Sequence, residues 1–498
     1  MTELTLPIDP KYFWAIVTLT GFALAVICVY AVMPRTEGKH TDPLDRLKIY
    51  LGAAQIPDGL FLMLALMWIC LFLALFGGLL LMLWELIWFA VPQNPAAEAS
   101  ARFALLRLAA MTATLGAVVA LPFTLIRIRL TREANKTADE SLFNDKINAA
   151  TEDLHAMRQR WDAERKQNIW EDDITRRNAA IDRLEGLVNE RPDTAPRVSR
   201  LLSVYVRELS REVPPEIPPK DATPVELQNW AFELTVKRSD MENAVRVLGR
   251  LKQIEGVCPN EITIDLRQAN LQKFDLGGLQ FSGARLAETH MQGAGFNGAQ
   301  LQETNLYYAQ MQWADFHKAH MEKADLSAAC MQGGHFVEAQ MQEADLNFAK
   351  LHWADLSGVN LQRADLSHAQ LRLTDLSGAL LQGVDLSAAH MDGADLYQAQ
   401  LQGANLSSAL FGTHTKISGA ELSASLLYGI DLSNQEIEFE QIRSGFGTAG
   451  TVLPGGDGPN SPNWPAHWPT LRMTAIEARN EWEKWQADPD NYTPPPAP

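Results

Sequence analysis

The chain has 498 residues, a formal net charge of −17 at pH 7 and four cysteines. A chain of this length is expected to form several domains, and its acidic excess argues against nucleic acid as a partner. Because no two of the cysteines form a CxxC pair, the sequence predicts neither a disulfide framework nor a zinc site.

Three long apolar segments in residues 1–126 predict a membrane domain that contacts the lipid bilayer. They extend from Tyr12 to Met33, from Leu60 to Val91 and from Phe103 to Ile126, and the last two contain one charged residue each. Each segment is longer than the about 20 apolar residues that cross a bilayer. A break at Gly77-Gly78 would divide the second segment into pieces of about 16 residues, which are short for a span, so we expect one helix there.

The charges near these segments predict their orientation. Lys and Arg residues follow the first and the third segment, whereas the loop 92–101 contains none. Because positively charged loops are retained in the cytoplasm, we expect the N-terminus outside and the chain after residue 127 in the cytoplasm. Glu85 and Arg107 lie at similar depths of the hairpin around Pro92, and charges in a bilayer tend to pair. We therefore predict an ion pair between Glu85 and Arg107. The alternative, a path for ions or protons, would require more polar residues than the three segments contain.

Residues 127–255 have the pattern of a helical segment interrupted by prolines. Spacings of four and three residues form a heptad seam, which consists of Phe143, Ile147, Ala150, Leu154, Met157 and Trp161. A second apolar run in another phase consists of Trp170, Ile174, Ile181, Leu184 and Val188. We expect helices from about Thr131 to Glu190 that pack on their neighbours. A homo-oligomeric coiled coil is the alternative.

The C-terminal half has a repeat of five residues. From Leu266 to Phe411 every fifth residue is Leu, Met or Phe, at thirty positions in succession, and the residue two before is Ala at 21 of 29 positions. This period fits neither a helix nor a strand. A fixed longer period indicates a solenoid, whose stacked units share one core.

Blocks such as Ala324-Asp325-Leu326-Ser327-Ala328 resemble the motif of the pentapeptide-repeat family. The resemblance implies a right-handed, four-sided β-helix over residues 256–437, with about 20 residues per coil and the apolar centre and the Ala pointing inward. Phe296, Phe316 and Phe336 should then stack along one wall, since they lie one coil apart.

Four blocks before the repeat extend this resemblance to bacterial membrane-anchored members of the family. They are Asn144–Asn148, Ala180–Glu185, Tyr205–Glu208 and Ala244–Arg250. The resemblance implies the same order of parts: a membrane domain, a cytoplasmic helical segment, the β-helix of residues 256–437, which forms a rod, and a short tail. It also implies a multi-pass protein of the bacterial inner membrane with its C-terminal domain in the cytoplasm.

Acidic residues recur every ten positions within the repeat. They are Asp325, Asp345, Asp355, Asp365, Asp375, Asp385 and Asp395, and Gln340, Gln370 and Gln400 lie between them. Ten residues are half a coil, so we expect two opposite acidic walls separated by two neutral, Gln-rich walls. The Asp side chains could also serve local hydrogen bonding in turns.

The register shifts by one residue after Phe411 and resumes at Ile417, which predicts a bulge. Residues 438–498 form a tail that contains a short amphipathic helix from Thr474 to Gln486. A solenoid needs its open end covered. We expect this helix, or the chain around Trp464 and Trp468, to cap the last coil, and residues 494–498 to be disordered.

The sequence predicts no catalysis, no cofactor and no metal. It contains no phosphate-binding loop and no HExxH, GxSxG or kinase motif. Eight of the eleven His lie between His290 and His414, on different walls and coils. Asp residues on a repeat lattice make poor catalytic pairs, because nothing desolvates them.

One group of aromatic residues stands out as a candidate partner site. Tyr307, Tyr308 and Phe348 fall on outward positions of one wall, and Trp313 and Trp353 fall on matching positions of the adjoining wall. Exposed aromatic groups often mark binding sites for other proteins. Alternatively, they cover the wall or contact the helical segment.

The function predicted from these features is that of a non-catalytic membrane-tethered scaffold, whose acidic rod binds cytoplasmic proteins. One alternative is a membrane sensor or effector gated through the rod. The other comes from the family resemblance, since soluble members mimic DNA and bind type II topoisomerases.

Overall fold

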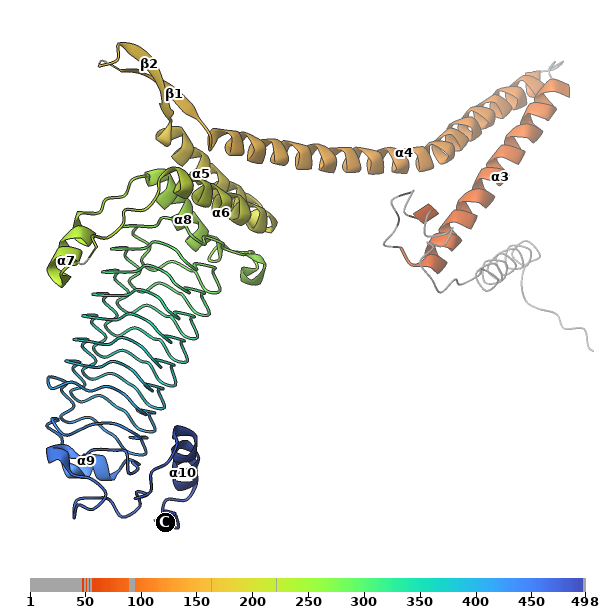
Figure 1. Ribbon diagram of the computed structural model, residues 1–498. Coiled ribbons are helices and arrows are strands. Elements are labelled where there is room, and N and C mark those ends of the chain that lie inside the picture. The colour runs from red at the N-terminus through yellow and green to blue at the C-terminus, as the bar shows by residue number, and fades with distance from the viewer. Residues whose placement is uncertain are drawn as a thin grey trace, which may run out of the picture. The chain divides into compact units, whose positions relative to one another are not determined.

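The computed structural model describes residues 47–48, 51, 53, 56–88, 95–162, 164–220 and 222–495 (Figure 1). The chain divides into two compact units, one up to Asp145 and one from Lys146 onward. The first predicted span, from Tyr12 to Met33, lies outside the described residues. The side chain of Glu85 also lies outside the described part of the structure, and its ion pair with Arg107 therefore stays a prediction.

Helices α3 (Asp58–Trp88) and α4 (Pro95–Asp153) account for most of the described part of the first unit. By length and composition, both are able to cross a membrane. Helix α3 is continuous through Gly77 and Gly78, as expected. The two helices are in contact, because the indole Nε1 of Trp68 donates to the Val118 carbonyl at 2.9 Å.

The helical prediction is wrong between Met157 and Asp172. Helix α4 ends at Asp153, and strands β1 (Met157–Asp162) and β2 (Gln167–Asp172) form an antiparallel hairpin that projects away from the solenoid (Figure 1). A spacing of four residues is even and fits the period of a strand as well as that of a helix. Met157 and Trp161 of the predicted seam, with Trp170, are therefore exposed on the hairpin.

The rest of the seam packs within the chain itself. Ile147, Ala150 and Leu154 are buried, which favours packing on neighbouring helices over the homo-oligomeric coiled coil. The following helices are α5 (Ile174–Glu190), α6 (Ala195–Glu212), α7 (Pro224–Glu233) and α8 (Ser239–Leu251). Asp153, at the end of α4, pairs with two arginines of α5, Arg176 at 2.6 Å and Arg183 at 3.0 Å.

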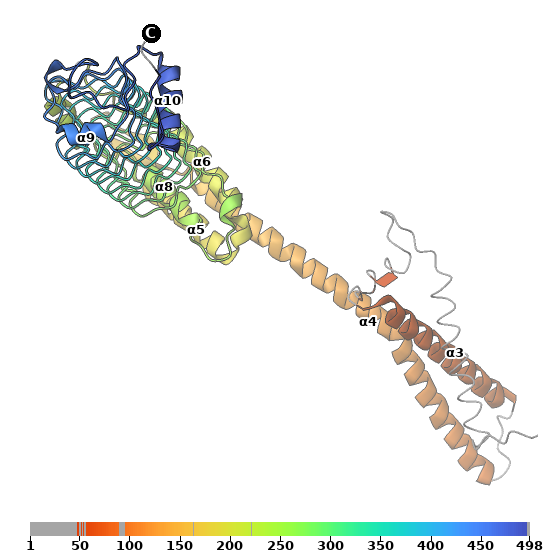
Figure 2. The same cartoon turned by 90° about the horizontal axis from the view of Figure 1, so that it is seen from below.

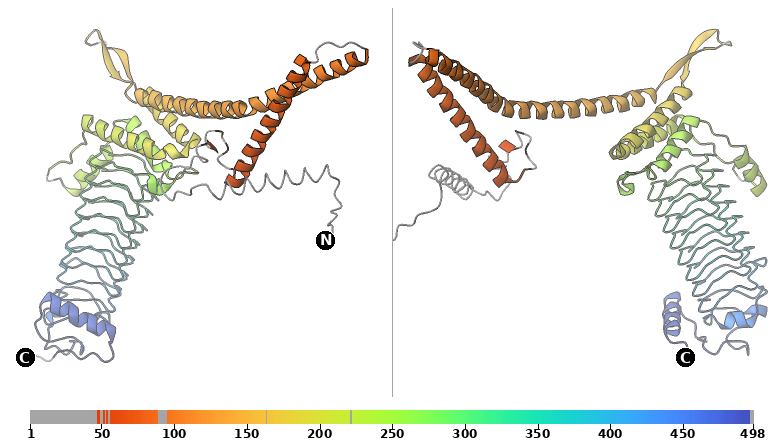
Figure 3. Two further views of the ribbon diagram at one scale, coloured as in Figure 1. Left: turned by 90° about the vertical axis from the view of Figure 1, so that its right-hand side faces the viewer. Right: turned by 180° about the vertical axis from the view of Figure 1, so that it is seen from behind.

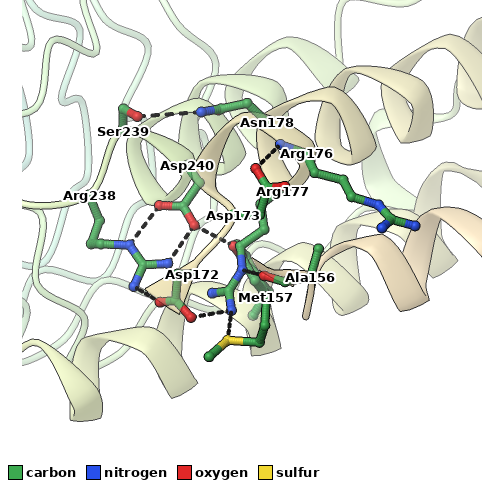
Figure 4. Close-up of polar contacts among 11 residues, drawn as sticks. Ala156, Met157, Asp172, Asp173, Arg176, Arg177, Asn178, Arg238, Ser239 and Asp240 are labelled. Atoms are coloured by element: carbon green, nitrogen blue, oxygen red, sulfur yellow. Dashed lines mark hydrogen bonds and ion pairs between the residues drawn. The ribbon is translucent and has the colours of Figure 1, made fainter. Parts of the chain in front are cut away.

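A buried polar network fixes the hairpin to these helices (Figure 4). Asp172, the last residue of β2, pairs with Arg177 at 2.5 Å and with Arg238 at 2.6 Å. Arg238 in turn binds both carboxylate oxygens of the fully buried Asp240, at 2.9 and 2.7 Å. The hydroxyl of Tyr205 donates to Asp240 at 2.6 Å. Each buried charge in the network thus has an opposite charge as partner.

From Asp265 the chain winds into a four-sided β-helix, and single-residue parallel bridges link residues twenty apart in successive coils. The apolar centres from Leu266 to Leu406 are all buried, so the core is continuous along the axis. Phe296, Phe316 and Phe336 stack with centroids 5.1 and 5.0 Å apart, as their spacing predicted.

The bridges confirm the predicted distribution of charge. Asp325, Asp345, Asp365 and Asp385 form one ladder, and Asp355, Asp375 and Asp395 form another half a coil away. Each of these seven carboxylates also accepts a hydrogen bond from the backbone N–H two residues on, at 2.8–3.1 Å. The Asp residues therefore serve the turns and make two walls acidic.

Helices α6 and α8 close the N-terminal end of the solenoid. In later coils the residue before each apolar centre donates its N–H to the coil before it, as Arg285 does to the Ile264 carbonyl at 2.9 Å. The first coil has no such neighbour, and the helices supply one acceptor per wall. The pairs are Asp265 with Ser203 Oγ, Asn270 with Ser210 Oγ, Asp275 with Glu242 Oε1, and Gln280 with the Gly249 carbonyl.

The extra residue predicted after Phe411 widens one corner. The bridge from Asp395 reaches Lys416, which is 21 residues on, and the Thr415 hydroxyl fills the corner by donating to the Met391 carbonyl at 2.8 Å. Exposed Thr413 and His414 form the bulge. The last bridge joins Asp431 to Val452.

Helices α9 (Phe439–Arg443) and α10 (Ala475–Ala487) lie at the end of the solenoid away from α5, α6 and α8 (Figures 2 and 3). Trp482 and Gln486 of α10 both donate to the Ala424 carbonyl, at 2.8 and 2.9 Å. Trp468 is buried and donates to the Gly445 carbonyl at 2.8 Å. Side-chain donors thus serve carbonyls at this end.

Candidate protein-binding face of the solenoid

Four of the five predicted patch residues stand at corners of the solenoid. The second residue after nearly every buried centre has a positive φ, and this holds for Tyr308, Trp313, Phe348 and Trp353, with φ between 55° and 59°. Such a φ is what the third position of a type II turn requires, and it suits glycine. Lys, Glu and Ala adopt such a φ at other corners, so backbone strain alone does not distinguish these four residues. Their aromatic rings do, exposed in Tyr308 and Phe348 and half-buried in Trp313 and Trp353.

These corner residues form two rows that flank one of the two walls without an Asp ladder. One row contains Tyr308, Phe348 and His368, and the other contains Trp313, Trp353 and Leu373; within each row the residues are separated by whole coils. We call this wall the aromatic face, defined by residues 308–313, 328–333, 348–353 and 368–373. Its upper part comprises the first two ranges, nearer the helices, and its lower part the last two.

The structure brings the predicted residues together and adds others. Tyr307 packs edge-on against Tyr308, with ring centroids 4.4 Å apart. Phe348 stacks on His368 at 4.8 Å, and Leu373 is 56% exposed. The sequence pattern of Tyr, Trp and Phe side chains does not include His368 and Leu373. Their place one coil after Phe348 and Trp353 is the signal that could have found them.

The lower part of the face is cationic on an acidic solenoid. It contains Lys350 and Arg372, both exposed, and no Asp or Glu. His352 lies between them, and its Nε2 is 2.9 Å from the Gln370 Oε1. Burial lowers the pKa of His352, so its ring is neutral at pH 7. The two fixed positive charges therefore come from Lys350 and from Arg372, of which Arg372 pairs with Asp392 in the next coil at 3.3 Å.

Helix α7 lies along the row of corners that contains Trp313, and it reaches the upper part of the face at Trp313. The ring of Phe232 is 6.4 Å from that of Trp313, and Lys273 Nζ lies 5.5 Å over the Phe232 ring. A Cβ on Gly293 would be 3.0 Å from the Ala231 carbonyl oxygen. Trp313 thus contacts the helical segment, which was one of the two predicted alternatives.

Chemistry of other kinds has little support in the described part of the chain. No group of three or more His, Cys, Asp or Glu that could hold a metal ion occurs among the residues that the structure describes. Burial and the hydrogen bond to Asp240 raise the pKa of Tyr205, and the hydrogen bonds of Asp240 lower its pKa against the effect of burial, but both residues belong to the network that fixes the hairpin.

A four-sided β-helix with an apolar centre at every fifth residue defines the solenoid as a pentapeptide-repeat domain. The comparison with protein families agrees, because the model described as pentapeptide repeats matches in 8 copies. The matched residues are 264–299, 295–333, 319–358, 339–378 and 369–408. No curated protein matches the chain.

Solved structures of pentapeptide-repeat proteins are similar to part of the chain. HetL from the cyanobacterium Nostoc sp. strain PCC 7120, a protein involved in regulating heterocyst differentiation, is 28% identical over 39% of this chain and 91% of its own, with a TM-score of 0.29. QnrB1, a plasmid-mediated fluoroquinolone resistance protein, is 19% identical over 36% of this chain and 89% of its own, with a TM-score of 0.25. A pentapeptide-repeat protein of the Arabidopsis thaliana thylakoid lumen is 29% identical over 20% and 65%, with a TM-score of 0.15.

Proposed function

We propose that the protein is a non-catalytic scaffold, tethered to a membrane, whose solenoid binds a protein partner through the aromatic face. One observation carries this proposal. The solenoid exposes large hydrophobic side chains at Tyr307, Tyr308, Phe348, Leu373, Tyr397 and Leu410. All except Tyr397 lie on the wall of the aromatic face or at its edge. Clustered apolar groups of this kind favour binding of another protein.

The tether consists of α3, α4 and the apolar segment near the N-terminus. The length and composition of the two described helices support it, and the distribution of Lys and Arg supports a cytoplasmic solenoid. The resemblance to membrane-anchored relatives points to the bacterial inner membrane. Washing membranes with alkaline carbonate tests this part of the proposal: the full chain stays in the pellet, and its release would contradict the tether.

The fold of the second unit suits a scaffold, because it fixes the aromatic face to the last turns of α4. The pairs of Asp153 with Arg176 and Arg183 join α4 to α5. Helices α6 and α8 then bond to all four walls of the first coil. A partner bound to the solenoid is thereby held at a set distance from Lys146.

We further propose that α10 caps the C-terminal end of the solenoid. Trp482 and Trp485 are buried against Leu426 and Phe446, near the last coil. Together with the donors to the Ala424 carbonyl, this cluster replaces the coil that is missing beyond the end.

Site-specific crosslinking in native membranes tests the binding function. A photo-crosslinking amino acid in place of Phe348 is expected to yield a discrete adduct with a partner, and the added change Trp353→Ala is expected to abolish it. The matched control is Tyr397→Ala, which removes an exposed ring from a different wall. No adduct at all, or equal loss with both changes, would contradict the proposed binding face.

A further inference from the structure

We infer that the lower part of the aromatic face binds a short acidic segment of a partner that carries an aromatic side chain, in the way that α7 packs its Phe232 against Trp313 at the upper part. This inference rests on the proposed function and specifies the chemistry of the partner. It follows from three observations: how the chain's own segment sits on the wall, which groups on the wall are unpartnered, and which charges line its unoccupied part.

Helix α7 and its preceding arm show what the wall accepts. The helix has the sequence Pro-Val-Glu-Leu-Gln-Asn-Trp-Ala-Phe-Glu, with two carboxylates and no cation. Its Phe232 packs between Lys273 and Trp313. In the arm, which is the segment between α6 and α7, the backbone of Glu216 forms two hydrogen bonds with the Gln272 side chain, both 2.8 Å long. The wall therefore binds an acidic segment through the aromatic ring of that segment and through its backbone.

The glutamines that follow Gln272 on the same wall are incompletely paired. Gln312 is 6% exposed, and its Oε1 has no hydrogen-bond partner among the described residues. The same holds for Gln332 Oε1, for His352 Nδ1 and for the indole Nε1 of Trp313. Buried polar atoms without partners cost free energy. Three of these atoms lie in the upper part of the face, and His352 Nδ1 lies in the lower part, where a segment laid along the wall would supply a partner to it.

The lower part of the face repeats the chemistry of the upper part without an occupant in the described chain. Trp353 corresponds to Trp313 two coils on, and Lys350 and Arg372 supply positive charge as Lys273 does above. Phe348 and Leu373 are each 56% exposed. Arg372 pairs with Asp392 in the next coil at 3.3 Å, whereas Lys350 has no ion pair among the described residues. On a chain with a net charge of −17, the cation at Lys350 therefore favours an acidic ligand.

The lower part of the face is shorter than α7. It covers two coils, which is about 10 Å at about 4.8 Å per coil. A helix of ten residues, the length of α7, is about 15 Å long. About seven residues of such a helix would therefore lie on the lower part, and the remainder would extend beyond it.

A peptide with the sequence of residues 222–234, which contain α7, is the probe for this inference. It is labelled with a fluorophore and titrated with the full chain in detergent, and binding is followed by anisotropy. The change Trp353→Ala is expected to weaken binding at least tenfold, and Lys350→Glu combined with Arg372→Glu to weaken it similarly and to remove its dependence on salt. Trp353→Phe, which keeps a ring, is expected to restore most of the affinity and shows that the loss is not one of folding.

Matched controls distinguish binding at the lower part of the face from binding elsewhere on the solenoid. Tyr397→Ala and Arg363→Glu change an exposed ring and an exposed cation outside the face, and each is expected to alter affinity less than twofold. A peptide in which both glutamates are replaced by lysine is expected not to bind. Binding that responds to Trp313→Ala but not to Trp353→Ala would mean exchange with α7 and would overturn the inference, as would absence of binding.

The result is distinguishable from a failure of the proposed function. If crosslinking in membranes captures a partner in a Trp353-dependent way but the acidic peptide does not bind, the face is a binding site for a different kind of ligand. If neither experiment depends on Trp353, the proposed function itself is wrong.

Discussion

The indole of Trp313 lies over the α-carbon of Gly333 in the next coil. A Cβ added to Gly333 would be 2.6 Å from the Cδ2 and Cζ2 atoms of this indole, a distance that real Cβ atoms do not show. Leu373 lies over Gly393 in the same row of corners, and there the added Cβ would be 2.6 Å from the Leu373 Cδ2. In this row, glycine thus provides the surface on which the bulky side chain of the preceding coil rests.

Replacing this glycine is expected to displace the indole. Gly333→Ala introduces a steric clash with Trp313 in addition to its positive φ of 65°, and we expect it to destabilise the protein by about 1–3 kcal/mol. The control is Gly378→Ala, where φ is also 65° but the added Cβ meets nothing within 4 Å; it should cost about 1 kcal/mol. Thermal unfolding followed by circular dichroism measures both, and equal shifts would contradict the steric account.

Changes at Asp365 are expected to separate its two roles. Its Oδ1 accepts a hydrogen bond from the Ser367 N–H at 2.8 Å, and Asp345 and Asp385 flank it on the ladder. Asp365→Ala removes the acceptor and should cost about 1–2 kcal/mol. Asp365→Asn keeps an acceptor and removes like-charge repulsion, so it should be neutral or slightly stabilising at low salt. Asn405 already accepts from Ser407 at the same ladder position, at 3.1 Å. The midpoint of urea unfolding measures both variants, and equal destabilisation would contradict this assignment.

The network around Asp240 predicts a defined response to acid. Burial acts to raise the pKa of Asp240, but its hydrogen bonds with Arg238 and Tyr205 outweigh burial and lower it. A carboxyl with a lowered folded-state pKa stabilises the protein above its unfolded pKa of about 3.9, and this contribution is lost as the pH falls through the folded value. Stability should therefore be insensitive to this group at pH 5–7 and fall below about pH 4.

The variant Asp240→Asn tests this response. It leaves the buried Arg238 with only the partly exposed Asp172 as partner, so we expect a loss of about 3–5 kcal/mol at pH 7. Its stability should then fall less steeply than that of the unaltered chain below about pH 4. Tyr205→Phe, which removes one hydrogen bond to Asp240, should cost about 1–2 kcal/mol. Parallel acid slopes for Asp240→Asn and the unaltered chain would rule out this assignment.

The closure of the first coil is testable at a single amide. Ser210→Ala removes the acceptor of the Asn270 N–H, whose hydrogen bond is 3.0 Å long, and should raise exchange of this amide about tenfold, since an unpaired group costs about 1–2 kcal/mol. Hydrogen exchange read by mass spectrometry measures this. Ser387→Ala, in the middle of the solenoid, serves as control and should leave exchange at Asn270 unchanged. Unaltered exchange in Ser210→Ala would contradict the role of α6.

The opposite end is expected to respond locally. Trp482 is buried, and Trp482→Ala removes both its packing on the last coil and its hydrogen bond to Ala424. We expect a local loss of about 3–5 kcal/mol, and faster exchange confined to the last coils, since solenoid units depend on their neighbours. The same change at the half-buried Trp353 should not affect these coils. A uniform increase along the whole solenoid would contradict a local cap.

The solenoid could be predicted from the sequence because each coil repeats one environment. The stacking of Phe296 on Phe316 follows directly from their separation by one coil, and the two acidic walls follow from the ten-residue recurrence of Asp. The cations of the lower part of the aromatic face could have been predicted in the same way, because Lys350 and Arg372 replace polar residues at positions of one wall. In the linear sequence they look like isolated charges among many acids.

The hairpin and the closed first coil depend on information that no local pattern contains. Met157 and Trp161 fit a helix and a strand equally, and the contacts of Asp172 with Arg177 and Arg238 decide between them only in three dimensions. Ser210 meets the amide of Asn270 sixty residues later, outside any repeat. Such pairings become visible only when the end of the solenoid is placed on the helices.

A coil length of twenty residues limits how this solenoid can change in evolution or by design. Removing one whole coil would shorten it by about 5 Å and leave every wall in line with its neighbours. Removing a single block of five residues would instead rotate everything beyond the cut by a quarter turn, so that Trp353 and Leu373 would no longer share a side with Trp313. Insertions and deletions within the coils that carry both rows should therefore occur in steps of twenty residues, whereas the widened corner at Thr415 lies beyond these rows and can change without disturbing them.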